Sequence, residues 1–476
     1  MLRVAPGLQA ILDLEDRAPD VLFETVPGSS VPLWPQVRNA LAVELGRLDF
    51  PTAPVGAVSV SRASAWRGLF DAFLPSQWDA SVARGQSGLC CIVGGSTVHQ
   101  VDGRERNWLV SDYAESQRGD AAILQWSGLP GRNGPPAFSR TWTLAPAETR
   151  AAGFARLSRR DPEAHIRALV TEYVRQLDVI LADEVLESLV VSATYQERSR
   201  PFVDHAVARA VDRLAPRVVL MEDASYGGRA SILALLRDRG IFVAEPQHGW
   251  IGPTHPAYSF GAAMHTEPLR QTLPDEVLTF GEYWSDGLRH PALLTPMGKP
   301  HLETATRSAP PIAERPDEVL IVSSIADPAE MSDFVIELRE ALGGTWGVRF
   351  RPHPAERREL GHRYGRLVDH HGVDIDERAD VYDSLASAKV VIGVASTVLF
   401  EARAFGCAVL ARDSAYFDYY VGELFGEPLQ SGSGTGRAAA NRVQEVAKQA
   451  NVASIDQRIW AENAMQRFVS WLDART

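Results

Sequence analysis

The feature that most constrains this sequence is a regular alternation of short apolar runs with amphipathic segments in its C-terminal half. The apolar runs have the length and composition of buried strands, and the segments between them have helical periodicity. Strands that alternate with helices form parallel sheets with helices on both faces. The predicted strands are 218–221, 241–244, 277–280, 318–323, 346–350, 390–394 and 408–411, and the predicted helices are 228–239, 328–343, 356–366, 380–387 and 396–405.

The alternation falls into two series, which predicts an α/β chain with two Rossmann-like domains that face a central cleft. A chain of 476 residues is also too long for one ordinary hydrophobic core. Earlier in the chain, 1–150 indicates short strands and turns, and 161–195 and 202–214 indicate helices. A proline-rich polar stretch separates the two series. The predicted organisation is an N-terminal domain at 1–303, a linker at 304–317, a C-terminal domain at 318–453 and a final helix within 454–476 that packs back on the domains.

Composition and charge exclude several classes of protein. The formal net charge is −12 and no dense Lys/Arg block appears, so the basic face of a nucleic-acid binder is missing. Cys90, Cys91 and Cys407 show no metal-ligand spacing, and the first two fall in an apolar run that predicts a buried strand. No run approaches the roughly 20 apolar residues that span a bilayer. We therefore expect a cytoplasmic protein without zinc or a cofactor, and leave open a peripheral contact with the inner face of the membrane.

Ligands of open parallel sheets bind beyond the carboxyl ends of the strands, so the turns after the strands carry the chemistry. The first such turn is Glu-Pro-Gln-His-Gly at 245–249, directly after the predicted strand 241–244. Because histidine titrates near neutrality, His248 can remove a proton from an attacking hydroxyl. Gly249 lets a substrate approach the backbone closely. The alternative is a histidine that satisfies buried loop backbone, and the spacing does not decide between the two.

The second turn is Arg-Pro-His-Pro at 351–354, after the predicted strand 346–350. The prolines stiffen the turn and fix the direction of His353. Arg351 and His353 suit a phosphate through charge and hydrogen bonding. The alternative is a turn whose prolines only end the strand.

The third turn is the most specific, because an apolar strand at 390–394 leads directly into Ser396 and Thr397. Serine and threonine are preferred at helix N-termini, where free N–H groups and the helix dipole favour an anion such as phosphate. Glu401 lies one helical turn beyond Thr397 on the same side, where it can accept hydrogen bonds from ribose hydroxyls. The alternative is an ordinary capped core helix with one exposed glutamate.

Together these segments resemble the two-domain, GT-B type glycosyltransferases of bacterial surface-carbohydrate synthesis. Similar motifs occur in capsular Kdo transferases, bacterial sialyltransferases and polysialyltransferases, and teichoic-acid glycerophosphotransferases. The resemblance is carried by the Gln-His-Gly, His-Pro and Ser/Thr motifs, and it extends over most of the chain through Trp34-Pro-x-x-Arg38, Asp112-Tyr113, the block 245–260, the run 273–284 and the segment 297–300.

The resemblance implies an enzyme that moves a sugar from a nucleotide-activated donor to a hydroxyl of a surface glycan, glycolipid or related acceptor, as in capsule biosynthesis. His353, Ser396 and Thr397 would hold the donor phosphate, with Arg351 in the place of a lysine common in such enzymes. Glu401 would hold the ribose. The pairing of the His-Pro and Ser/Thr motifs favours a CMP-linked donor.

Metal independence is expected as well. Asp374-Ile-Asp376 is the one Asp-x-Asp spacing, and it is not placed at a strand exit as a metal-dependent transferase requires. We interpret this segment as surface.

The base and the reaction class stay open at this point. A base at His248 favours inversion of configuration, whereas carboxylates can serve instead: Glu222, Asp223, Glu245 or Glu282. The acceptor side of the cleft is predicted at Gln247, Gly249, His255, Tyr258 and Glu282. Alternatives to a glycosyltransferase are a CDP-alditol phosphotransferase, an epimerase acting on a UDP-sugar, and a catalytically silent scaffold of polysaccharide assembly.

Overall fold

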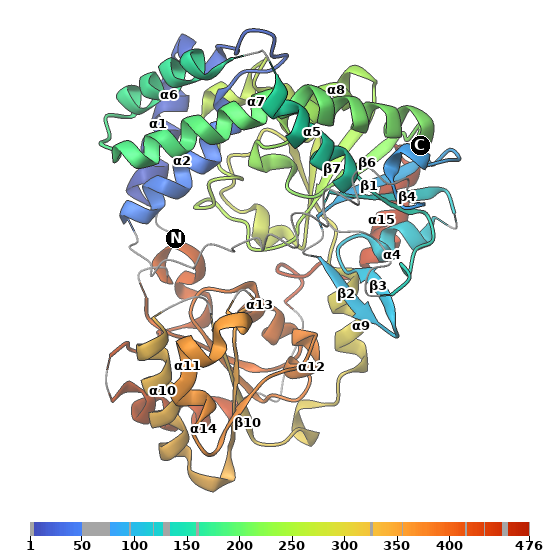
Figure 1. Cartoon of the computed structure of the whole chain (residues 1–476). Helices are drawn as coiled ribbons and strands as arrows, with labels where there is room; N and C mark the ends of the chain where they lie inside the picture. The colour runs from blue at the N-terminus through green and yellow to red at the C-terminus, as the bar shows by residue number, and fades with distance from the viewer. Residues whose placement is uncertain are drawn as a thin grey trace.

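The computed structural model describes residues 4–49, 77–94, 97–117, 119–126, 134–158, 161–323, 327–354, 356–414, 417–432, 434–449 and 456–475. Two α/β units lie one above the other in Figure 1, with the N-terminal half of the chain in the upper unit and most of the C-terminal half in the lower.

The sheet of the first unit has seven parallel strands within the described ranges, in the order β5-β4-β1-β6-β7-β8-β9. Its central strands are buried along their whole length, because helices cover both faces of the sheet. The strands are β1 (Leu89–Val93), β4 (Ala121–Gln125), β5 (Thr141–Thr143), β6 (Val218–Met221), β7 (Phe242–Pro246), β8 (Glu276–Thr279) and β9 (Leu293–Pro296).

Helices surround this sheet in two groups. One group packs mainly on itself and forms a helical layer beside the sheet: α1 (Pro6–Arg17), α2 (Trp34–Asp49), α6 (Glu163–Leu177) and the first half of α7 (Asp183–Leu214). The other group covers the sheet: α4 (Ser111–Ser116), α8 (Ala230–Asp238) and the second half of α7, on which α5 (Ala145–Leu157) packs. An antiparallel hairpin of β2 (Val98–Val101) and β3 (Arg104–Asn107) extends from this unit.

The second unit is smaller, and the structure describes five parallel strands in its sheet, in the order β12-β11-β10-β13-β14. These are β10 (Glu318–Val322), β11 (Gly347–Arg351), β12 (Val373–Ile375), β13 (Val390–Gly393) and β14 (Ala408–Ala411). Its helices are α10 (Pro328–Leu342), α11 (Leu360–Val368), α12 (Val381–Leu385), α13 (Thr397–Ala404) and α14 (Thr435–Gln449).

Both sheets have the strand order of a Rossmann fold. Counted along the chain, the second sheet runs 3-2-1-4-5, and the first begins in the same way before adding two strands. The order reverses between β1 and β6 in one sheet and between β10 and β13 in the other. The predicted α/β fold of two Rossmann-like domains in a GT-B arrangement is therefore confirmed.

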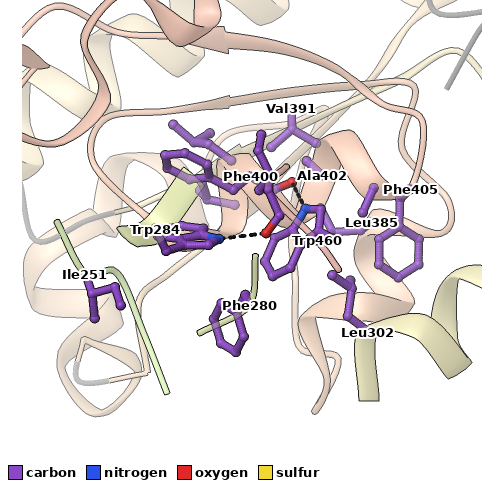
Figure 2. Close-up of a cluster of buried hydrophobic side chains, with 14 of the residues drawn as sticks. Ile251, Phe280, Trp284, Leu302, Leu385, Val391, Phe400, Ala402, Phe405 and Trp460 are labelled. Atoms are coloured by element: carbon purple, nitrogen blue, oxygen red, sulfur yellow. Dashed lines mark hydrogen bonds between the residues drawn. The ribbon is translucent and has the colours of Figure 1, made fainter. Parts of the chain in front are cut away.

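A hydrophobic cluster joins the two units (Figure 2). Phe280 and Trp284 come from the first unit, Phe400 comes from the second, and Trp460 from the C-terminal segment packs between them. Trp284 Nε1 donates to the carbonyl of Ile459 at 2.8 Å, and Trp460 Nε1 donates to the carbonyl of Phe400 at 3.3 Å. The relative position of the units is thus set by a shared core.

Two sequence-based helix assignments have wrong boundaries, one in the first unit and one at the C-terminus. The helices predicted at 161–195 and 202–214 are in fact α6 and α7, and α7 continues through Pro201 because both of its halves pack in hydrophobic clusters. The first part of the proline-rich stretch expected as linker is helix α9 (Pro300–Ser308), which has Pro300 in its first turn and buries Leu302.

The predicted C-terminal helix is shorter than expected. It is α15 (Ala464–Asp473), and the non-helical residues before it insert into the shared core. α15 returns to the first unit, where Phe468 stacks on Tyr113 of α4 with ring centroids 4.2 Å apart. The sequence also missed α1, α2, α4, α5, β9, β12 and α14. No helix in the described ranges is long and apolar enough to cross a membrane.

Candidate functional site

A cavity of about 290 Å³ lies between the two units, and both units supply its walls. The second unit contributes residues from the carboxyl ends of β10, β11 and β13, which includes the point where its strand order reverses; this is where open α/β sheets bind ligands. The lining residues are His99, Trp108, His248, Phe280, Lys299, His301, Val322, Ser323, Arg351, Pro352, His353, Pro354, Ala379, Asp380, Val381, Tyr382, Ser396, Thr397, Val398 and Glu401.

The N-terminus of α13 faces this cavity. Ser396 is the N-cap, and its Oγ accepts a hydrogen bond from the backbone N–H of Val398 at 3.2 Å, which confirms the predicted cap. Thr397 is the first helical residue and also lines the cavity. The positive end of the helix dipole and the free N–H groups of the first turn thus favour an anion here.

The His-Pro turn forms a neighbouring wall, but its arginine is already paired. Arg351 Nη1 lies 2.8 Å from Asp376 Oδ2, and the guanidinium also donates to the carbonyls of Arg378 and Ala379. Asp376, interpreted from the sequence as surface and not at a strand exit, directly follows β12 and is buried in its pair with Arg351. Burial lowers the pKa of His353, so its imidazole is neutral at pH 7. His353 thus lines the cavity, its contact with a donor phosphate stays a prediction, and Arg351 fixes the turn.

Glu401 forms an ion pair that links the two units. Its carboxylate accepts from Lys299 Nζ at 2.5 Å and from Tyr382 Oη at 3.1 Å, and the side chains of Lys299 and Glu401 are 9% and 5% exposed. The Lys299 ammonium also lies 4.6 Å from the ring centroid of Trp108. Glu401 is thus more enclosed than the sequence indicates, and its contact with ribose stays a prediction.

On the side of the first unit, His248 after β7 lines the cavity, whereas Glu222 and Asp223 after β6 are not among its lining residues. His248 Nε2 lies 3.2 Å from Asp223 Oδ1. Glu222 accepts a hydrogen bond from the backbone N–H of Gly94 at 2.5 Å, which links the carboxyl ends of β6 and β1. Burial lowers the pKa of His248, although the nearby carboxylate of Asp223 acts in the opposite direction. Burial also raises the pKa of Glu222 to about 7. An imidazole–carboxylate pair therefore stands where the strand order of the first sheet reverses.

The other predicted catalytic and acceptor residues lie outside the cavity wall. Glu245 is fully buried and accepts from Ser225 and from Tyr258 Oη at 2.7 Å. Gln247 ties its own turn together, since its amide donates to the carbonyl of Gly249 and accepts from the N–H of Phe280. Glu245 and Gln247 thus hold the turn after β7 in place and do not line the cavity. His255 is a partly buried ring that accepts from the N–H of Ala257 and stacks on Trp250, whereas Glu282 is exposed.

The buried Glu245 makes stability depend on pH. Burial raises the pKa of Glu245 to about 8 from 4.5, so the folded protein keeps a proton that the unfolded chain releases. This contribution is complete below the unfolded pKa and is lost as pH rises through about 8. Glu245→Gln cannot ionise, so the decline between about pH 6 and pH 7.5 should become shallower by about 1.4 kcal/mol per pH unit.

Urea unfolding at several pH values measures this effect. Burial also raises the pKa of Glu148, to about 7. Glu148→Gln is therefore the control: it should make the decline of stability with pH shallower as well, but over a lower pH range than Glu245→Gln does. Parallel stability curves for the Glu245→Gln variant and the wild type would contradict the interpretation.

Sequence reasoning missed several residues of the cavity. His301 of α9 pairs with Asp380 at 3.1 Å, and Asp380 also caps α12. His99 comes from the β2–β3 hairpin. Lys299 lies in a segment noted only for its resemblance; the signal that could have drawn attention to it is a lone lysine before a helix-starting proline. Among the described residues, no group of three or more His, Cys, Asp or Glu could hold a metal ion, and metal independence stays a prediction.

No protein-family model and no curated protein matches this sequence. Solved structures share its general shape at low identity. A UDP-GlcNAc 2-epimerase from Neisseria meningitidis bound to UDP-GlcNAc has a TM-score of 0.48 and 11% identity, over 81% of this chain and 99% of that one. A trehalose 6-phosphate synthase from Burkholderia multivorans has a TM-score of 0.37 and 12% identity, over 82% and 94%. The calicheamicin glycosyltransferase CalG4 has 0.41 and 14%, over 81% and 95%. With scores this low, the fold assignment rests on the sheet order described above.

Proposed function

We propose that this protein is a glycosyltransferase that moves a sugar from a nucleotide-activated donor, preferably CMP-linked, to a hydroxyl of a glycan or lipid-linked acceptor. One observation carries the proposal: the N-terminus of α13, the turn at His353 and the imidazole of His248 line the same cavity between the two sheets. The first two are phosphate-binding features, and the third belongs to a pair suited to proton transfer.

In this proposal the donor lies on the second unit. Its phosphate is held by the first turn of α13, at Ser396 and Thr397, and by a hydrogen bond from His353. Negative charge grows on the phosphate as the sugar leaves, and oriented N–H groups in an enclosed site stabilise that charge. Glu401, kept in place by Lys299 and Tyr382, is the proposed ribose contact.

The acceptor enters from the first unit, beside His248. Filling the cavity between the units excludes water, which favours transfer to the acceptor over hydrolysis of the donor. His99, Lys299 and His301 form a polar part of the cavity wall, where they can contact sugar hydroxyls.

A panel of nucleotides tests this function. Thermal unfolding is measured with CMP, CDP, UDP and GDP, because a ligand at 100 times its Kd adds about 2.7 kcal/mol of stability. Hydrolysis is then followed for CMP-N-acetylneuraminate, CDP-glycerol and UDP-GlcNAc. We expect the largest shift with CMP and slow hydrolysis of the CMP-sugar. No shift with any nucleotide would favour a scaffold, turnover of CDP-glycerol a phosphotransferase, and isomerisation of UDP-GlcNAc an epimerase.

His353→Ala is expected to weaken CMP binding by about 10- to 100-fold, because a hydrogen bond to a charged group contributes about 1.5–3 kcal/mol. The measurement is isothermal titration with CMP. His371→Ala is the control, since His371 is exposed and is not among the residues that line the cavity. Because burial lowers the pKa of His353, wild-type affinity should rise as pH falls below neutrality, and His353→Ala should lose that rise. Unchanged affinity in His353→Ala would remove this residue from the donor site.

A further inference from the structure

We infer that Asp223, and not His248, takes the proton from the acceptor hydroxyl, and that His248 positions the Asp223 carboxylate. This inference rests on the proposed function and adds the identity of the base. Asp223 lies at the point where the strand order of the first sheet reverses.

Asp223 follows β6 by two residues, next to the end of β1. Ligands of open α/β sheets bind at such a reversal point. The backbone at Asp223 is left-handed, with φ 59° and ψ 27°, a conformation that non-glycine residues adopt rarely and that aspartate tolerates best. The chain thus turns sharply after β6 and leaves this carboxylate at the ligand edge of the sheet.

Exposure separates the roles of the two partners. The Asp223 side chain is 53% exposed, whereas the His248 side chain is 20% exposed. The imidazole presents Nε2 to Asp223, and its Nδ1 is enclosed without a hydrogen-bond partner among the described residues. A neutral imidazole has one N–H, and its position next to a carboxylate places that N–H on Nε2. His248 is then a donor to Asp223, and neither of its nitrogens is open to a hydroxyl.

The two carboxylates nearest to Asp223 in the turns after β6 and at the end of β7 are already used. Glu222 is 4% exposed and binds the N–H of Gly94, and Glu245 is 0% exposed and bound by Ser225 and Tyr258. Burial favours the protonated form of both, since it raises the pKa of Glu222 to about 7 and that of Glu245 to about 8. Asp223 is therefore the carboxylate that combines exposure with a fixed hydrogen-bond donor behind it.

The acceptor hydroxyl transfers its proton to a carboxylate oxygen of Asp223 while its own oxygen bonds to the anomeric carbon of the donor. The bond from that carbon to the phosphate oxygen breaks, and its electron pair leaves with the nucleotide. The His248 N–H keeps the Asp223 carboxylate oriented toward the acceptor, and the proton then passes from Asp223 to solvent. In hydrolysis, water replaces the acceptor.

The test compares Asp223→Asn, His248→Gln and His248→Ala in the hydrolysis of CMP-N-acetylneuraminate, UDP-GlcNAc and GDP-mannose. Removing a general base typically costs 10²- to 10⁴-fold in rate. We expect Asp223→Asn to lose about 10³-fold in kcat with its CMP-induced thermal shift unchanged. Glutamine keeps an N–H near the position of Nε2, so His248→Gln should stay within about tenfold of wild type while His248→Ala falls about 100-fold. Asp238→Asn, at an exposed aspartate that ends α8, is the matched control.

The outcomes separate this inference from the proposed function. If Asp223→Asn stays within about tenfold of wild type and both His248 variants are equally inactive, His248 is the base and the inference is wrong. A glycosyl adduct on Asp223, seen by intact-protein mass spectrometry, would make this residue a nucleophile and would also overturn it. If the wild type neither binds CMP nor hydrolyses any of the three donors, the proposed function itself fails.

Discussion

Replacing Arg38 with methionine is expected to lower the free energy of unfolding by about 3–5 kcal/mol, because the change leaves a buried carboxylate without its counter-charge. Arg38 is 2% exposed and Glu15 is 0% exposed, with Arg38 Nε 2.5 Å from Glu15 Oε1. The same guanidinium donates to the carbonyl of Pro256 and to that of Ser259 at 2.6 Å. The ion pair thus joins the N-terminal helices to the segment after the Gln-His-Gly turn.

Urea denaturation followed by circular dichroism measures this loss. The double variant Arg38→Met with Glu15→Gln leaves no buried charge and should recover part of the stability. Arg47→Met is the control, because the side chain of Arg47 is 64% exposed in its pair with Glu44 and should contribute at most about 1 kcal/mol. A loss below about 1 kcal/mol in Arg38→Met, or a double variant no more stable than the single one, would contradict the assignment.

Thr397→Glu is expected to have opposite effects on stability and on ligand binding. A carboxylate in the first turn of α13 interacts favourably with the helix dipole, which stabilises the fold by about 0.3–1 kcal/mol. The same charge would stand about 4 Å from a bound phosphate, where like charges near a protein surface repel by about 4 kcal/mol. The affinity for CMP should therefore fall by about two to three orders of magnitude.

Titration calorimetry with CMP and thermal unfolding without ligand measure the two effects separately. Thr397→Gln is the matched control, since it has the size of glutamate without the charge and should retain most of the affinity. If the glutamate variant bound CMP as well as the glutamine variant, the phosphate would lie elsewhere. A loss of stability in both variants would instead indicate that the side chain of Thr397 packs in a way that larger residues disrupt.

The strands and the three turns could be predicted because their signals are local. Val390, Val391 and Ile392 form an apolar run between Lys389 and Gly393, and Ser396 is a cap whose partner lies two residues away. Each of these patterns depends on neighbours in the sequence, so the periodicity is sufficient to identify it. That the turns within one sheet lie close together could also be predicted, since a parallel sheet places all carboxyl ends of its strands at one edge.

The residues that the sequence could not assign depend on distant partners. Lys299 and Glu401 are 102 positions apart, and Arg38 and Ser259 are 221 positions apart. The wrong C-terminal helix has a similar cause: Trp460 fits an amphipathic pattern, but it packs in the shared core instead of on a helix. Which charges pair and which side chains enter the core depend on the tertiary structure, and the pattern of adjacent residues in the sequence does not specify it.

The aromatic cluster between the units also limits how the cleft can open. Pulling the units straight apart would bring Trp284, Phe400 and Trp460 into water, at roughly 4–6 kcal/mol for each ring. A relative motion of the units that keeps these three rings packed exposes less apolar surface than a direct separation. The aromatic cluster therefore favours rotation of the two units about it over their separation.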